Sequence, residues 1–221
     1  MRQFDVELKE LREGIMAMAG VAEDMIELTI QALAEPSPAK AEQVNQLDRK
    51  MDEWELRLDQ QCIDLLALRN PAASDLRRIA SSLKIIPELE RIGDHCCNIA
   101  RRVGMVHPPI LAGNDLERLG TETRSMVRRA VDAFVSNDAA LAHAVILSDD
   151  SVDALYGKIY RDLLRIMLAD PLCIERASHL ILVIKNWERV ADEATNIAEE
   201  VLFILEGHSA KHPYLRGDSV E

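Results

Sequence analysis

The sequence Glu90-Arg91-Ile92-Gly93-Asp94-His95-Cys96-Cys97-Asn98 returns 98 residues further along the chain as Glu188-Arg189-Val190-Ala191-Asp192-Glu193-Ala194-Thr195-Asn196. Both stretches follow the pattern Glu-x-x-x-Asp-x-x-x-Asn. Residues four apart on a helix stack on one face, so the Glu, Asp and Asn of each copy form a single polar ridge. The repeat therefore predicts two equivalent helices, one in each half of the chain.

An apolar stripe accompanies each polar ridge at helical spacing. In the first copy the stripe consists of Ile85, Leu89, Ile92, Cys96, Ile99 and Val103. In the second copy it consists of Val183, Trp187, Val190, Ala194, Ile197 and Val201. Because a helix turns about 100° per residue, Asp94 lies about 160° from Ile92. We therefore expect each helix to pack through its apolar stripe and to carry its carboxylates on the outer face.

The composition favours an all-helical fold. Of the 221 residues, 48% are hydrophobic but only 4% are aromatic. Sheets favour aromatic and β-branched residues, whereas this chain is rich in the helix formers Ala, Leu, Glu and Arg. We expect six long helices, at about residues 4–34, 38–70, 74–106, 114–135, 136–170 and 172–206.

The two halves of the chain repeat each other beyond the ridge. At an offset of 101 residues, apolar positions of the first two helices match those of the fourth and fifth, as with Met25 and Met126. Three helices followed by three similar helices predict two tandem, pseudo-symmetric three-helix bundles. We expect the first bundle at residues 1–107 and the second at 108–207, followed by a mobile tail at 208–221.

Local signals predict several helix ends. Ser37 and Pro38 are typical of the N-cap and first residue of a helix. Asn114 is expected to cap the fourth helix, and Gly207 is expected to end the sixth. Pro87 lies inside the third helix and should kink it, because proline removes a backbone donor and crowds the preceding turn.

Charge and hydropathy restrict the classes of partner. The formal net charge is −12, which argues against duplex nucleic acid and anionic membranes and favours cations. The longest clean apolar run is residues 180–184, far short of the ~20 residues of a membrane-spanning helix. The N-terminus shows no apolar signal core. We expect a cytoplasmic protein without membrane insertion.

The cysteines and histidines show none of the usual metal-site spacings. The four cysteines, Cys62, Cys96, Cys97 and Cys173, contain no C-x-x-C pair and are interpreted as reduced residues in or near the core. No H-E-x-x-H or Glu-x-x-His sequence is present. This argues against a zinc protease and against a ferritin-like di-iron core.

Carboxylates of neighbouring helices are expected to lie at one height. Asp48 and Asp52 precede Pro71 by 23 and 19 residues, and Glu90 and Asp94 follow it by 19 and 23. Helices joined by a short turn run antiparallel, so equal distances from the turn mean equal heights. We call these four residues the first quartet.

The second half repeats the arrangement around Pro171. Asp149 and Asp153 precede this proline, and Glu188 and Asp192 follow it at similar distances. We call these four residues the second quartet. Each quartet is expected on the surface of its own bundle, at a separation that packed helices allow.

Two interpretations of the quartets follow from the residues. Crowded carboxylates repel one another, and a cation would relieve the repulsion. All-oxygen ligands select hard cations such as iron, manganese, magnesium or calcium, and Asn98 and Asn196 would add neutral oxygens or orient the acids. In the alternative, the quartets are solvated acidic faces paired weakly with nearby arginines.

At these residues the chain resembles the PhoU family of phosphate-transport accessory proteins. The resemblance covers all six helices, and its specific part is the duplicated ridge together with the aspartate pairs on the preceding helices. It implies two three-helix bundles with multinuclear metal clusters, iron among them, on their outer surfaces. It also implies a cytoplasmic negative regulator, often a homodimer, which connects the ATPase of a phosphate ABC transporter to a phosphate-sensing histidine kinase.

Other functions stay open at this point. The first alternative is a carboxylate-bridged metalloenzyme, and the second is a helical scaffold without metal. An enzyme needs an enclosed pocket with open coordination positions. The acids lie outside the core stripes, and neither a nucleophile-base pair nor a Gly-rich phosphate loop is visible. We therefore expect a regulator without catalysis.

Overall fold

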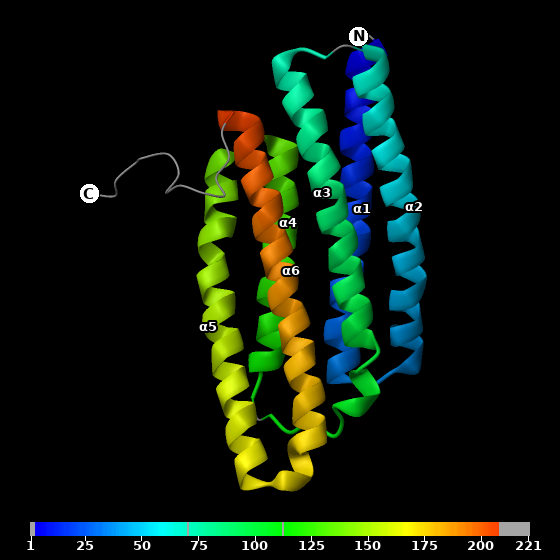
Figure 1. Ribbon diagram of the computed structural model, residues 1–221. Helices are drawn as coiled ribbons and strands as arrows, with labels where there is room; N and C mark the ends of the chain where they lie inside the picture. The colour runs from blue at the N-terminus through cyan, green and yellow to red at the C-terminus, as the bar shows by residue number, and fades with distance from the viewer. Residues whose placement is uncertain (1–2, 70, 112, 208–221) are drawn as a thin grey trace, which may run out of the picture.

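The computed structural model describes residues 3–69, 71–111 and 113–207. Within these ranges the chain forms six α-helices and two short 3-10 helices, and it contains no strand (Figure 1). The elements are α1 (Gln3–Ala34), α2 (Pro38–Arg69), α3 (Ala73–Ala100), η1 (Val103–Met105), α4 (Asp115–Ser136), α5 (Ala139–Ala169), η2 (Pro171–Cys173) and α6 (Ile174–Glu206). The expected all-helical fold is confirmed. The expected tail, residues 208–221, lies outside the described residues.

The helices form two groups of three that lie side by side. Helices α1, α2 and α3 pack against one another, as do α4, α5 and α6 (Figure 1). The groups meet along α3 and α6 and along α1 and α4, while α2 and α5 lie at the outer edges. The bundle ranges 1–107 and 108–207 stay predictions, because the linker that contains η1 offers no sharper boundary.

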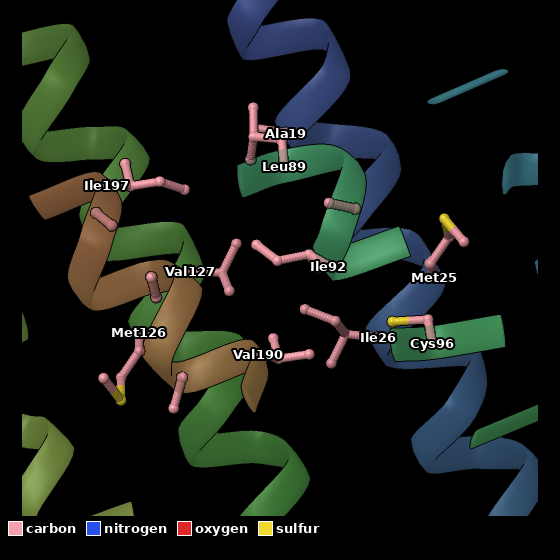
Figure 2. Packing of buried hydrophobic residues seen from close by; sticks show 14 of the residues in the cluster. Ala19, Met25, Ile26, Leu89, Ile92, Cys96, Met126, Val127, Val190 and Ile197 are labelled. Carbon is pink, nitrogen blue, oxygen red and sulfur yellow. The ribbon is translucent and has the colours of Figure 1, made fainter. Parts of the chain in front are cut away.

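Both apolar stripes are buried, and together they form a core shared by the two groups. All six residues of the α3 stripe and all six of the α6 stripe are buried. Between the groups, Ile92 points toward Val127 and Ile26 points toward Val190 (Figure 2). Hydrophobic burial therefore stabilises the pairing of the two groups as well as each group by itself.

Several helix ends agree with the local signals. Helix α2 begins at Pro38, and Ser37 Oγ accepts a hydrogen bond from the Lys40 backbone N–H at 3.4 Å. Gly207 ends α6 with φ +77°, a left-handed conformation that glycine adopts without a steric penalty. Asp138 is the N-cap of α5, and its side chain accepts from the Leu141 N–H at 3.0 Å.

Two expected helix ends are wrong, and one expected cap is confirmed in its position but not in its hydrogen bond. Helix α3 stops at Ala100 rather than near Val106, because the backbone tightens there and the Arg102 N–H bonds to the Ile99 carbonyl. Asn114 is the N-cap of α4 but makes no side-chain cap hydrogen bond. Helix α6 begins at Ile174 rather than near Leu172, since η2 intervenes. Helix α3 continues on both sides of Pro87, and a kink there stays a prediction.

The four cysteines are buried and unbonded to one another, as expected for reduced thiols. Among the helices that the structure describes, none combines the length and apolarity needed to cross a bilayer.

Candidate metal centres

The first quartet joins α2 and α3 through carboxylates whose charges act on one another. Burial raises the pKa of Asp48, and the charges of Asp52 and Asp94 raise it further, while a hydrogen bond with Cys97 lowers it. Burial together with the same three aspartates raises the pKa of Glu90 to about 7. The four side chains are therefore close neighbours in the fold.

A glycine allows this close approach of the two helices. A Cβ atom at Gly93 would lie 3.3 Å from Met51 Cγ and 3.4 Å from Asp48 Oδ1, tighter than most such contacts. Because Gly93 has no side chain, the Asp48 carboxylate can pack close to the backbone of α3. In the second half this position is Ala191, which is buried.

Sequence reasoning missed Glu55 as a member of this acidic surface. Its charge contributes to the raised pKa of Glu90, and burial with Asp59, Asp52 and Asp94 raises its own pKa. The signal was present, because Glu55 follows Asp52 at the three-residue spacing that stays on one helix face.

The second quartet joins α5 and α6 in the same way. Burial raises the pKa of Asp149 to about 6, followed by the charges of Asp153, Asp192 and Glu188. Burial and Glu188 raise the pKa of Asp192 to about 6. Asp150, which the sequence reasoning did not single out, adds to the effect on Asp149.

A lysine contacts the second quartet. Lys185 Nζ lies 2.6 Å from both carboxylate oxygens of Glu188, and it sits over the Tyr156 ring at 5.7 Å from the centroid. Its charge lowers the pKa of Asp192 against the effect of burial. Sequence reasoning did not identify Lys185, although Lys185 and Glu188 stand at ion-pair spacing on one helix.

The two asparagines of the ridges make contacts away from the quartets. Asn98 Oδ1 accepts a hydrogen bond from Arg101 Nη1 at 3.1 Å. Asn196 Nδ2 donates to Glu193 Oε2 at 3.0 Å and to Glu88 Oε2 at 3.4 Å. A role for these amide oxygens as metal ligands stays a prediction.

A polar network lies where α3 meets α6, and sequence reasoning did not find it. We call it the seam network, and its members are Glu88, Arg91, His95, Asn186, Glu193 and Asn196. Arg91 Nη1 donates to Glu88 Oε2 at 2.6 Å and lies 3.7 Å from Glu193 Oε2. His95 Nδ1 lies 3.1 Å from Asn186 Oδ1.

The seam network follows the internal repeat of the chain. At the offset of 98 residues, Glu88 matches Asn186 and His95 matches Glu193. The contact of Glu88 with Glu193 therefore corresponds to the contact of Asn186 with His95. Such pairing is what a twofold relation between antiparallel α3 and α6 produces.

Two carboxyl groups of the seam network share a hydrogen bond, and their pKa values separate. Burial raises the pKa of Glu88 to about 7, with further contributions from Glu193. Burial also opposes ionisation of Glu193, but hydrogen bonds with His95, Glu88 and Asn196 outweigh it and lower the pKa of Glu193 to about 2. Burial and Glu193 thus favour the protonated form of Glu88, while the donors around Glu193 favour its ionised form.

The quartets suit hard cations by the chemistry of their donors. Their eight carboxylates supply only oxygen, and the raised pKa values of Glu90, Asp149 and Asp192 reflect burial and negative charges that a cation would offset. The side chains of Asp94 and Asp192 can be reached from solvent, although neighbouring atoms partly cover the Asp192 carboxylate. Within the described ranges, no three His, Cys, Asp or Glu side chains already form a set of metal ligands. Binding would therefore require side-chain rotation at the surface.

Comparison with known proteins places the whole chain in one family. The model of the PhoU domain matches twice, at residues 15–103 and 116–201. A Pseudomonas putida protein named phosphate-specific transport system accessory protein PhoU homolog is 36% identical over 100% of this chain and 87% of its own length. A protein of the same name from Aquifex aeolicus is 36% identical over 95% of this chain and 96% of its own.

Solved structures give the same result for the fold. The crystal structure of PhoU from Pseudomonas aeruginosa has a TM-score of 0.89 and 36% identity, and covers 93% of this chain and 100% of that one. The crystal structure of the phosphate transport system regulatory protein PhoU from Streptococcus pneumoniae has a TM-score of 0.88 and 28% identity. The match covers 94% of this chain and 99% of that one. With a domain match in each half and relatives along its full length, the chain belongs to the PhoU family.

Proposed function

We propose that this protein is a cytoplasmic accessory regulator of phosphate transport. In this role it connects the ATPase of a phosphate ABC transporter to a phosphate-sensing histidine kinase and keeps the kinase output low when phosphate is plentiful. The supporting observation is the match to the PhoU domain in both halves, together with full-length relatives named as accessory proteins of the phosphate-specific transport system.

The test is genetic and uses the natural host. Deletion of the gene should raise expression of phosphate-starvation genes in phosphate-rich medium, and expression of the full chain should restore repression. Unchanged expression after deletion would refute the regulatory role. Efficient turnover of a small substrate by the purified protein would instead favour the metalloenzyme.

The partner assignments need a biochemical test. Tagged transporter ATPase and the cytoplasmic part of the kinase should each retain this protein on a column, and sedimentation should give the mass of a homodimer. Retention of neither partner would leave phosphate regulation without the proposed adaptor mechanism. If the protein is a monomer and still binds both partners, only the proposed homodimer is refuted.

We further propose that each quartet binds hard cations, iron or manganese first, at the surface of its own bundle. Asp48, Asp52, Glu90 and Asp94 would hold the ion in the first bundle, and the second quartet would hold it in the other. A bound cation supplies positive charge that offsets the crowded carboxylates. The carboxylates themselves provide oxygen ligands from two helices, so binding also ties α2 to α3 and α5 to α6.

The metal proposal is tested by stoichiometry and stability. Wild type and the variant Asp94→Ala with Asp192→Ala are reconstituted with iron or manganese, and bound metal and melting temperature are measured. A ligand that binds only the folded state raises its stability, so only wild type should show a metal-dependent increase. Absence of both metal and shift in wild type would make the quartets solvated faces. Full stoichiometry in the variant would place the ligands elsewhere.

A further inference from the structure

The two quartets differ in the residue that stands one turn before the ridge glutamate. In the first half this residue is Pro87, three positions before Glu90. In the second half it is Lys185, three positions before Glu188. Proline brings neither charge nor a donor, whereas the Lys185 ammonium contacts both oxygens of Glu188 at 2.6 Å.

The difference between Pro87 and Lys185 matters because the first quartet has few positive charges near it. In addition to its own four carboxylates, the first quartet faces Glu55 on α2. Two cations act on it through their charge: Arg101 acts on Asp48 and Arg91 acts on Glu90. The Arg101 guanidinium donates to Asn98 at 3.1 Å, and the Arg91 guanidinium donates to Glu88 at 2.6 Å. The first quartet therefore has no cation in direct contact among the described residues.

The second quartet carries its own counter-charge. Around it, α5 contributes Asp150 and α6 contributes Glu193 as further acids. The Lys185 side chain is partly buried, and the face of Tyr156 lies 5.7 Å from its ammonium. Two independent contacts, an ion pair and a cation–π contact, thus hold the ammonium at Glu188.

We propose that Lys185 is the resident counter-ion of the second quartet and that a divalent cation must either displace the ammonium from Glu188 or bind beside it against its charge. The first quartet then binds metal at lower concentrations than the second. This inference rests on the metal binding proposed above. It gives one chain two metal thresholds, with the bundle of α4 to α6 responding only after the bundle of α1 to α3 is occupied.

The physical reason is competition between like charges. An ammonium within about 5 Å of a divalent ion repels it by more than 1 kcal/mol even at high effective dielectric, which corresponds to about tenfold or more in affinity. If the lysine moves aside, it loses its contacts with Glu188 and Tyr156. Either route weakens the second site relative to the first.

The experiment measures Mn²⁺ binding to the full chain after treatment with EDTA and removal of the chelator. Asp94→Ala isolates the second quartet and Asp192→Ala isolates the first, and titration calorimetry gives the dissociation constant of each. The first quartet should bind about tenfold or more tightly than the second. Lys185→Met, placed in the Asp94→Ala background, should tighten the second quartet by about tenfold.

Two control variants separate the local effect from general charge. Lys185→Arg keeps a cation at Glu188 and should preserve the weak second site. Lys9→Met removes one ammonium from the exposed pair with Glu13 on α1 and should change neither site. Helical content and melting temperature of each metal-free variant identify any that fail to fold.

The outcomes separate this inference from the metal proposal. Equal affinities in the two single-site proteins, or a second site that Lys185→Met does not tighten, would overturn the inference while metal binding stands. The same tightening after Lys9→Met would also overturn it. If neither wild type nor any variant binds Mn²⁺, the metal proposal fails and this inference fails with it.

Discussion

Replacing Glu88 by glutamine should remove a loss of folding stability that occurs at the contact of α3 with α6 as pH rises. The Glu88 carboxyl hydrogen-bonds with Glu193, and its pKa is raised to about 7, first by burial and then by Glu193. A group with a raised pKa in the folded state stabilises the fold fully below its unfolded pKa of 4.5. As pH rises from 4.5 to about 7, the unfolded chain releases the proton first, so stability falls.

The expected change in the free energy of unfolding follows from the size of the pKa shift of Glu88. A rise from 4.5 to about 7 corresponds to roughly 3 kcal/mol for an isolated, fully desolvated group. Arg91 stands beside Glu88 at 2.6 Å and is half exposed, so partial screening reduces the effect to about 1–2 kcal/mol. Glutamine keeps the shape and a donor for Glu193 but cannot ionise. Glu88→Gln should therefore nearly equal wild type at pH 4 and exceed it by about 1–2 kcal/mol at pH 8.

Urea unfolding followed by circular dichroism at pH 4, 5, 6, 7 and 8, in EDTA, measures this difference in unfolding free energy. Other carboxylates titrate in the same range. The quantity to compare is therefore the difference in unfolding free energy between the two proteins at each pH, rather than the pH dependence of either protein alone. The melting temperature should differ by about 2–8 °C at pH 8. Glu200→Gln is the control, because it loses the pair with Lys84 at 3.0 Å and should only destabilise. A constant difference in unfolding free energy between wild type and Glu88→Gln from pH 4 to pH 8 would refute the reasoning.

Three further predictions concern the fold and the second quartet. Gly120→Ala should cost about 1–3 kcal/mol in chemical denaturation, because its Cβ would lie 2.7 Å from Ile30 Cγ1 and 2.9 Å from Trp187 Cζ2; unchanged stability would mean that both side chains move aside freely. Asp138→Ala should cost about 1 kcal/mol by removing the α5 cap, whereas Asn114→Ala, which removes no cap bond, should cost less in the same assay. Asp192→Asn should flatten the fall in metal-free stability between pH 4 and pH 6, because burial raises the pKa of Asp192 from 3.8 to about 6; parallel pH curves would contradict this assignment.

Much of the fold followed from local rules in the sequence. The spacing of Ile92 and its neighbours predicted which helix face is buried, because a helix repeats every 3.6 residues regardless of its partners. Counting from Pro71 predicted that Asp48 and Asp94 would meet, because a short turn forces the joined helices to run antiparallel. These inferences need only one helix or one helical hairpin, so sequence distance carries the information.

Contacts between the two groups of helices were decided by tertiary structure. Glu88 and Glu193 lie far apart in the chain, on helices of different groups, and no hairpin between them fixes their relative height. The sequence also did not predict the balance of charge at the second quartet, because the ion pair of Lys185 with Glu188 depends on side-chain rotamers and on the Tyr156 ring of α5. The sequence by itself determined the helices, their buried faces and the pairing of carboxylates within each hairpin. Only the packing of α3 on α6 and of α5 beside α6 decided which charges are neutralised, because Coulomb energies depend on distances that local periodicity does not specify.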